Sequence, residues 1–353
     1  MAITRRLGIK TAWMSDIHLG SRHTHDVGML SLALTHIAPR QLDILGDTID
    51  GYELSRKPHW DKGCEEALQR LHALAQSGTQ VRMIPGNHDE PLRGWLDAAG
   101  INRDNRQDHL LLVPRSSFPV YNGDGKGIRL MQQATFSNGE GTHIYMHGDE
   151  NQQNDPAKHP LVPVYDAFYY RIAAITPLFN RLRPGRPYRA LTLDFQSFAC
   201  RHAMDFVGDF ERTQTATAKA EGVAGVFCGH IHYPADKMVD GVHYRNPGSM
   251  QADQTLLIEN DRGEIKQVNW GTIALRLRRA KGDGTRTARV LDEVAEQWGA
   301  ERIAAPLPFT YRDPGVDTAT GLLRSTEADL IATATFGRSY GINGRKMPVQ
   351  PVL

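Results

Sequence analysis

The sequence contains few cysteines, no long apolar run and almost no net charge. Its three cysteines are an odd number without C-x-x-C spacing, which excludes both a disulfide framework and a cysteine zinc site. Nowhere do about 18 apolar residues run together, as a membrane-spanning helix requires. The first residues also lack the apolar region of a signal peptide. These absences predict a protein of the reducing cytoplasm.

The balance of charge narrows the choice of partner. The chain of 353 residues has 41 Lys and Arg against 40 Asp and Glu, so its formal net charge is +1 and no global field attracts a polyanion. This disfavours nucleic acid as a partner and confines any anion site to a local cluster. The hydrophobic content of 40% is typical of a globular protein with a large core, and it leaves the oligomeric state open.

Short apolar runs that end in polar residues or glycine recur along the chain. They read IKTAWMSDIHLG, LDILGDTID, VRMIPGNHDE, THIYMHGDE and GVAGVFCGHIH. Between the first three runs, residues 26–38 and 63–77 place Leu, Ala and Ile at helical spacings of three and four. Alternating strands and helices predict an α/β fold, in which polar side chains at the C-terminal strand ends meet to form sites.

The rest of the chain divides by composition. The pieces HLLLVP and IRLMQQATF predict strands of a second sheet, and residues 151–220 have a helical pattern that indicates an insertion. We therefore expect a core of residues 1–150 and 221–275 with this insertion between its parts. A C-terminal extension, residues 276–353, contains an amphipathic helix at 285–303 and ends in a loose tail with Gly and Pro.

Each of the five strand ends carries side chains that bind hard or borderline metal ions. These side chains are Asp16, His18, Asp47, Asn87, His88, His147, His230 and His232. A lone histidine is more often a hydrogen-bonding residue than a ligand, but chance does not explain their appearance at successive strand ends. Carboxylate, imidazole and amide without thiolate suit Mn²⁺, Fe²⁺ or Zn²⁺. A bridging carboxylate would hold two such ions about 3.5–4 Å apart, the spacing used for displacement at phosphorus.

The order of these motifs resembles that of the calcineurin-like binuclear metallophosphoesterases. That family has D-x-H, G-D, G-N-H-D or G-N-H-E, H and G-H-x-H, and every element occurs in order between about residues 10 and 250. The resemblance implies a four-layer α/β/β/α sandwich that binds two divalent metal ions. Manganese is the expected metal, with iron or zinc as alternatives.

The resemblance also implies which residue holds which ion. The ligands of one metal would be Asp16, His18 and His232. The ligands of the other would be Asn87, His147 and His230. Asp47 would bridge the two ions. Glycine adjoins a ligand at Gly46, Gly86, Gly148 and Gly229, where the missing Cβ allows close approach.

The chemistry implied by the resemblance needs no serine or cysteine nucleophile. A hydroxide that bridges the metals would attack phosphorus. His88 would face the substrate phosphate as an electrostatic stabiliser or general acid, and Asp89 would orient its ring.

Several short sequence motifs are similar to those of one group within this family. SDIHLGS, GDTIDGYEL and VRMIPGNHDE resemble the UDP-2,3-diacylglucosamine pyrophosphatases, which cleave a nucleotide-linked lipid to a lipid phosphate and UMP. In that group a helical cap after the HGD segment holds acyl chains, and residues 151–220 occupy this place. The best-known members have arginine where this chain has His88, and NPGSM replaces the expected closing motif. The resemblance implies a nucleotide-sugar lipid substrate and peripheral contact with the inner face of the membrane.

The insertion is basic and aromatic. Between Ala167 and Leu193 arginines are interleaved with Phe and Tyr, and this stretch of the sequence contains no Asp or Glu. The candidate substrate-binding residues are Arg171, Arg181 and Arg183, because guanidinium groups bind phosphate in a bidentate manner. The alternative interpretation is an amphipathic helical pair with a solvated basic face.

Three functions compete on this evidence. The leading hypothesis is a metal-dependent phosphoester or pyrophosphate hydrolase acting on a nucleotide-sugar lipid or a related phosphorylated small molecule. The second is a phosphodiesterase, nuclease or protein phosphatase on the same metal core. The third is a non-catalytic scaffold, which would be expected to lose ligands or the catalytic histidine that this chain keeps.

Overall fold

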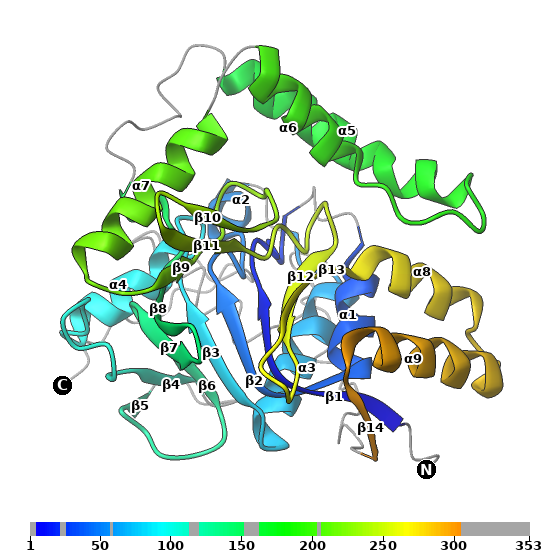
Figure 1. Cartoon of the computed structure of the whole chain (residues 1–353), viewed down its shortest axis with the longest axis horizontal. Helices are drawn as coiled ribbons and strands as arrows, with labels where there is room; N and C mark the ends of the chain where they lie inside the picture. The colour runs from blue at the N-terminus through cyan, green and yellow to red at the C-terminus, as the bar shows by residue number, and fades with distance from the viewer. Residues whose placement is uncertain are drawn as a thin grey trace, which may run out of the picture.

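The computed structural model describes residues 5–21, 26–56, 59–112, 120–151, 162–202 and 206–304. Within these ranges the chain forms a nine-stranded sheet and a five-stranded sheet with helices around them (Figure 1). Every helix in the described part is too short or too polar to span a lipid bilayer. The tail predicted after residue 304 lies outside the described residues.

The first sheet is parallel at its centre and antiparallel at its edges. In spatial order its strands are β13 (Ile265–Asn269), β12 (Thr255–Glu259), β1 (Arg5–Met14), β2 (Ile37–Leu45), β3 (Gln80–Ile84), β6 (Ile128–Leu130), β4 (Leu110–Leu112) and β5 (Val120–Tyr121). A ninth strand, β14 (Glu301–Ala304), pairs with the beginning of β1, while β12 pairs with its end. The predicted C-terminal extension therefore contributes a strand to this sheet as far as residue 304.

The second sheet is smaller than the sequence suggested. Its strands in spatial order are β10 (Ala235–Val239), β11 (Val242–Asn246), β9 (Gly225–Phe227), β8 (Gly141–Tyr145) and β7 (Ala134–Asn138). The HLLLVP piece and the start of IRLMQQATF, predicted for this sheet, form β4 and β6 of the first sheet instead. Short apolar strands look alike in sequence, and their partners are decided by tertiary pairing.

Helices cover the outer face of the first sheet. They are α1 (Val27–His36), α2 (Gly51–Arg56), α3 (Lys62–Gln76), α4 (Glu90–Ala98), α8 (Trp270–Arg279) and α9 (Gly284–Trp298). In β12, Leu256 and Ile258 join the core beneath these helices, whereas Leu257 between them faces the second sheet. The predicted amphipathic helix at 285–303 is confirmed in its first part as α9. It ends at Gly299, whose φ of 65° suits glycine at a helix C-terminus.

Aromatic side chains fill the space between the two sheets. Trp13 of β1 stacks on Phe227 of β9 with ring centroids 4.7 Å apart, and its Nε1 donates a 2.8 Å hydrogen bond to the Tyr145 hydroxyl. Phe136 meets the Trp13 ring edge-on at 5.4 Å. These contacts hold the sheets face to face, and the predicted mixed α/β fold with two sheets is confirmed.

The predicted insertion contains three helices, of which one packs on the second sheet and two form a separate pair. They are α5 (Val162–Arg181), α6 (Leu191–His202) and α7 (Phe206–Ala220). Val207 and Phe210 of α7 pack with Val226 and Tyr244 of the second sheet, so α7 belongs to the core by its contacts. The pair α5 and α6, here called the helical hairpin (residues 162–202), crosses the top of the molecule in Figure 1. The hairpin is thus the part of residues 151–220 that matches the predicted cap.

Candidate metal centre

The predicted ligands follow five strands and meet at one end of the two sheets. Asp16 and His18 follow β1, Asp47 follows β2, Asn87 follows β3, His147 follows β8, and His230 and His232 follow β9. Ligand atoms of Asp16, His18 and His232 lie within 4.8 Å of one another, as do those of Asp47, His147 and His230. The structure therefore brings the first predicted ligand set together, and it joins His147 and His230 of the second set with Asp47.

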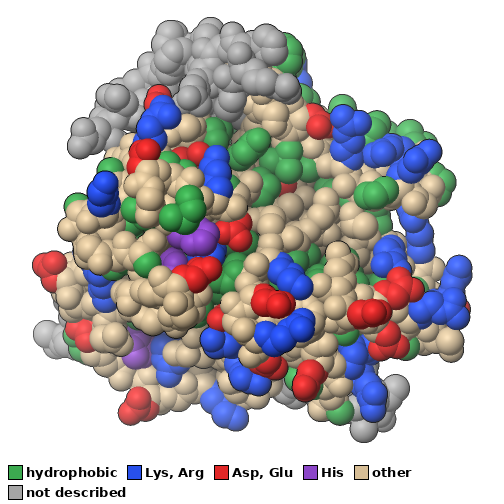
Figure 2. All heavy atoms as spheres, in the orientation of Figure 1, with side chains coloured by type: hydrophobic (Ala, Val, Ile, Leu, Met, Phe, Trp, Pro, Cys, Tyr) green, Lys and Arg blue, Asp and Glu red, His purple; other side chains and the backbone are tan. Residues whose placement is uncertain are grey.

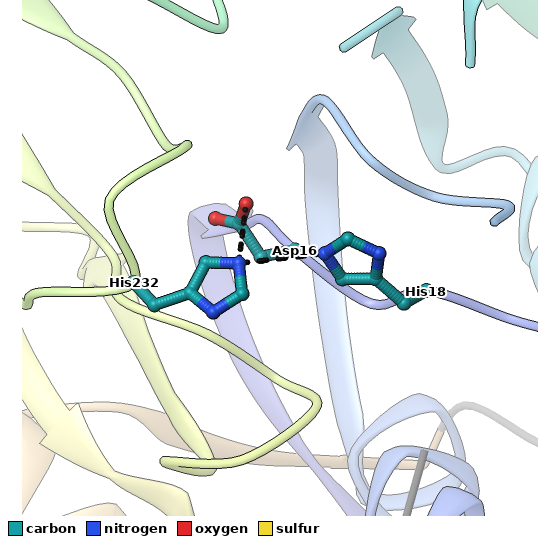
Figure 3. Close-up of side chains that lie close together, drawn as sticks. All are labelled: Asp16, His18 and His232. Carbon is teal, nitrogen blue, oxygen red and sulfur yellow. Dashed lines mark hydrogen bonds and ion pairs between the residues drawn. The ribbon is translucent and has the colours of Figure 1, made fainter. Parts of the chain in front are cut away.

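The first group surrounds His232 (Figure 3). His232 Nε2 lies 3.2 Å from Asp16 Oδ1 and 3.4 Å from His18 Nε2. Asp16 is fully buried, and both of its carboxylate oxygens accept from the backbone N–H of His230 at 3.2 Å. Burial opposes the charge of Asp16, but His232 lowers its pKa. Three potential ligands thus face one small volume.

The second group adjoins the first through Asp47. His147 Nε2 lies 3.3 Å from Asp47 Oδ2, and the same oxygen lies 3.6 Å from His18 Nε2. Asn87 Oδ1 lies 3.1 Å from His230 Nδ1. Asp47 therefore stands between the groups, where the sequence predicts a bridging ligand.

The hydrogen bonding of His147 fits a metal ligand. Its Nδ1 donates a 2.8 Å hydrogen bond to the Leu45 carbonyl, so a neutral ring would present the lone pair of Nε2 to a metal ion. Among the described residues, Nε2 is buried without a hydrogen-bond partner. Burial opposes the charge of Asp47, but His147 holds the pKa of that carboxyl well below its usual range. Ionised carboxylates beside an imidazole lone pair suit a pair of divalent ions.

The backbone is strained at five predicted ligands. The angle φ is 51° at Asp16, 51° at His18, 52° at Asp47, 72° at His230 and 53° at His232. In the described part of the chain only eight residues other than glycine have positive φ. Each costs about 1–3 kcal/mol and persists only where the surrounding structure enforces it, as at functional sites.

Glycine makes room for two ligands. A Cβ at Gly86 would lie 2.1 Å from Asp47 Oδ1, and one at Gly46 would lie 2.0 Å from His147 Nδ1. These distances are too short for any side chain. The predicted close approach is confirmed at both positions.

The His88 ring is oriented by a residue that the sequence prediction missed. His88 Nδ1 lies 2.9 Å from Asp50 Oδ1, and the other oxygen of Asp50 lies 3.4 Å from His18 Nδ1. Burial opposes the charged ring, but Asp47 and Asp50 raise the pKa of His88 to about 9. The signal was present in GDTID, where Asp50 is the next carboxylate after Asp47.

Asp89 has a different role from the predicted one. Its buried carboxylate accepts hydrogen bonds from the backbone N–H groups of Thr48 at 2.9 Å, Ile49 at 2.8 Å and Gly86 at 3.2 Å. Asp89 therefore joins the loops after β2 and β3, and the orienting contact to His88 comes from Asp50. Burial and repulsion from Asp47 raise the pKa of Asp89 to about 6.

An ion pair supports the segment after His147. Arg93 of α4 binds both carboxylate oxygens of Asp149 at 2.6 and 2.7 Å, and Asp149 begins the short helix η1 (Asp149–Asn151). Arg93 also donates to the Pro85 carbonyl at 2.9 Å. The strand ends that carry Asn87 and His147 are thereby tied together.

The helical hairpin touches the first group directly. The Tyr169 hydroxyl of α5 lies 2.8 Å from His232 Nδ1. No sequence signal distinguished Tyr169 from the other aromatic residues of the insertion. In Figure 2, histidine and acidic side chains adjoin on the face below hydrophobic side chains.

The predicted substrate-binding arginines all lie on the hairpin, but at different distances from the ligands. Arg171 is exposed two residues after Tyr169. Arg181 is also exposed, and Arg183 lies over the Phe179 ring at 4.8 Å. At 1.5 Å rise per residue, Arg181 is about 18 Å further along α5 than Tyr169. Arg181 and Arg183 are therefore not brought to the predicted ligands.

The chain is similar to a family of known sequences and to several solved structures. The sequence model of a family described as calcineurin-like phosphoesterase matches residues 9–234. A search of the curated proteins found no match.

Similar solved structures include YfcE, a phosphoesterase from E. coli (13% identity, 74% of this chain, 99% of that chain, TM-score 0.29). An archaeal phosphodiesterase is 12% identical over 74% of this chain and 99% of its own, with a TM-score of 0.31. Vps29 from Entamoeba histolytica, in complex with zinc, has 13% identity, coverages of 74% and 98%, and a TM-score of 0.30.

Proposed function

Because the chain belongs to the calcineurin-like phosphoesterase family and is a metal-dependent phosphoester hydrolase, we propose that it cleaves the pyrophosphate of a nucleotide-sugar lipid. The UDP-2,3-diacylglucosamine pyrophosphatase group, which the sequence resembles, is the closest description of this activity. The proposal concerns the substrate and the roles of individual residues.

The observation that carries the proposal is the apolar surface of the helical hairpin. Five large hydrophobic side chains on the hairpin are at least half exposed: Phe168, Ile175, Leu178, Leu182 and Phe198. The hairpin also contacts His232 through Tyr169, so the same helix carries apolar surface and reaches the proposed metal centre. A nucleotide-sugar lipid would bind the metal centre with its phosphate and cover the apolar side chains of the hairpin with its acyl chain. A nucleic acid or phosphoprotein would leave those apolar side chains exposed to water.

The ligand assignment follows the two observed groups, with Asp47 between them. When bound, two divalent ions supply Lewis acidity that activates water and offsets phosphate charge. His88 uses Nδ1 to bind Asp50, which leaves Nε2 to donate a proton or hydrogen bond to the leaving oxygen. Mn²⁺ is the metal we propose, since oxygen and imidazole donors suit it.

The three hairpin arginines would have different roles. Arg171, which is exposed two residues after Tyr169, would meet the polar part of a substrate near His232. Arg181, about 18 Å further along α5 than Tyr169, and Arg183, just beyond the end of α5, would meet distal anionic groups or the headgroups of a membrane surface. A cytoplasmic enzyme in peripheral contact with the inner face of the membrane is part of this proposal.

The test compares a lipid-linked substrate with a small chromogenic phosphodiester, using Mn²⁺-loaded protein. The double variant Ile175→Ser, Leu178→Ser removes apolar side chains that are 55% and 58% exposed. If an acyl chain covers roughly 100 Å² of this surface, at about 25 cal/mol per Å², then kcat/KM for UDP-2,3-diacylglucosamine falls about 70-fold. Hydrolysis of the chromogenic diester is expected to stay unchanged.

The matched control is Met238→Ser in β10, because Met238 is 57% exposed and lies outside the hairpin. It should change neither rate. Equal losses on both substrates in the double variant would contradict a lipid-binding hairpin. Faster hydrolysis of simple phosphodiesters, nucleic acid or phosphoprotein than of the UDP-linked lipid would favour the alternative phosphodiesterase, nuclease or protein phosphatase activity.

A further inference from the structure

The two ring nitrogens of His232 have different partners. Its Nε2 faces Asp16 and His18, on the side where the first metal is proposed. Its Nδ1 lies 2.8 Å from the hydroxyl of Tyr169, which comes from the helical hairpin. One ligand of the core is thus in contact with the hairpin through a single polar atom.

This arrangement selects one tautomer of the imidazole. A neutral histidine has one N–H and one lone pair, and a metal ligand must present the lone pair. If Nε2 binds the metal, Nδ1 carries the hydrogen and donates it to the Tyr169 oxygen. A hydrogen bond of this kind fixes both the tautomer and the angle of the ring.

Packing holds the Tyr169 hydroxyl in place. Tyr169 is only 5% exposed and forms a buried cluster with Ala173, one turn later in α5, and with Ala252 of the core. The segment that carries Ala252 also binds the first ligand loop, because Gln251 N donates to the Asp16 carbonyl at 3.0 Å. Tyr169 and Asp16 are therefore positioned by the same stretch of the core.

The second helix of the hairpin attaches beside the same ligand. Gln196 of α6 donates a 2.9 Å hydrogen bond to the carbonyl of Ile231, the residue before His232. Thr192 donates to the buried carboxylate of Asp253, next to Ala252. Docking of both helices and the orientation of His232 are consequently parts of one packing arrangement.

We propose that Tyr169 is a positioning residue for His232, through which docking of the helical hairpin and metal binding at Asp16, His18 and His232 strengthen each other. The inference rests on the ligand assignment of the proposed function. Reciprocity is required by linkage, since a hairpin that increases metal affinity must itself be stabilised by the metal to the same degree. The bound metal would thereby fix the surface that we propose for the acyl chains.

The test is metal titration of metal-free Tyr169→Phe by calorimetry, with Mn²⁺ as the probe. Loss of an outer hydrogen bond to a ligating histidine typically lowers affinity about 10–100-fold. We expect this loss in one of two binding events, with the other unchanged. The matched control is Tyr188→Phe, since the Tyr188 hydroxyl donates to the Ala252 carbonyl at 3.0 Å and anchors the hairpin without touching His232.

Hydrogen exchange supplies a second measurement that is independent of activity. Mn²⁺ should slow exchange in the α5 segment around residues 169–173 in the wild type and in Tyr188→Phe, but much less in Tyr169→Phe. Equal losses of affinity in the two variants, or none in Tyr169→Phe, would overturn the inference. Failure of the wild type to bind two equivalents, or of His232→Ala to lose one, would instead contradict the ligand assignment.

Discussion

Two clusters of histidines and carboxylates in this protein contain the same residue types, but an arginine side chain enters one of them. In the proposed metal centre, the imidazoles of His18, His147 and His232 face the carboxylates of Asp16 and Asp47. In the second sheet, ligand atoms of Glu140, His143 and His243 also lie within 4.8 Å of one another. There, however, the side chain of Arg245 enters the cluster; we call these four residues the Arg245 cluster.

Arg245 occupies the positions that a metal ion would use. Its Nη1 lies 2.8 Å from Glu140 Oε2 and 3.3 Å from His143 Nε2, while Nη2 lies 3.2 Å from His243 Nε2. Burial and Arg245 lower the pKa of His143, whereas in the metal centre burial is outweighed by Asp47, which raises the pKa of His147. Spacing of histidines and carboxylates is thus insufficient to define a metal site, because an internal cation can satisfy the same lone pairs.

Backbone conformation separates the clusters as well. His143 and His243 lie within the regular strands β8 and β11, whereas five ligands of the proposed centre have left-handed φ values after strands. Strain therefore marks the cluster that we expect to bind metal.

The largest expected effect comes from Asp47→Ala. This change removes charge from both proposed metal positions, so bound metal should fall from two equivalents to fewer than one. Activity should drop by more than about 10⁴-fold, beyond the loss typical for one acid or base. Asn87→Ala should weaken only one position. Elemental analysis after dialysis measures the stoichiometry, and two retained ions in Asp47→Ala would remove the distinction between the clusters.

A smaller loss is expected from His88→Gln, which should keep both metals. His88 contacts Asp50 and is proposed to act on the leaving oxygen, so its replacement should lower kcat about 10²–10⁴-fold. His143→Gln in the Arg245 cluster is the matched control and should leave kcat unchanged. Steady-state kinetics with the chromogenic diester measure both, and wild-type turnover of His88→Gln would exclude this role.

Arg245→Met should make the second cluster more like the first. Arg245 is buried, and its loss leaves the histidines without a donor, which should lower the free energy of unfolding by about 1–3 kcal/mol. Partial exposure of Glu140 keeps the loss small. We also expect this variant to bind a third equivalent of Zn²⁺. Arg82→Met, which breaks a 2.6 Å pair with Asp43, should destabilise the protein without that gain.

The pH dependence of stability should separate His88 of the metal centre from His143 of the Arg245 cluster in metal-free protein. The folded-state pKa of His88 is raised to about 9, so its contribution is complete below about 6.5 and is lost as the pH rises through 9. The pKa of His143 is lowered, so its contribution is present above about 6.5 and is lost as the pH falls.

Urea unfolding between about pH 5 and 9.5 measures these contributions. His88→Gln should flatten the alkaline decline, and His143→Gln the acidic one. The same change of slope in both variants would contradict the opposite signs.

Sequence patterns predicted the parts of the site that depend on local order. Asp16, Asp47 and His147 each follow an apolar run directly, and parallel strands carry such residues to one edge of a fold. The resemblance implied that Asp89 orients the ring of His88, its neighbour in sequence. The ring turns instead toward Asp50, whose loop is brought beside it by the pairing of β2 with β3.

Contacts between distant segments could not be predicted in the same way. Tyr169 is one of several aromatic residues in the insertion, and only tertiary packing selects it to meet His232, 63 positions later. The helices of the insertion were also read as one unit, although α7 packs on the second sheet. Likewise, the pairing of β14 with β1 depends on residues almost 300 positions apart.

The place of β1 in the first sheet has a consequence for synthesis on the ribosome. β1 pairs with β2 on one side, but on the other side with β12 and β14, which end at residues 259 and 304. At about 5–20 residues per second, roughly 15–60 s separate the emergence of β1 from that of its last partner. During that interval one edge of β1 lacks its partners, and an unpaired strand edge is prone to aggregate. Metal loading at the residues after β1 should therefore follow the synthesis of β14.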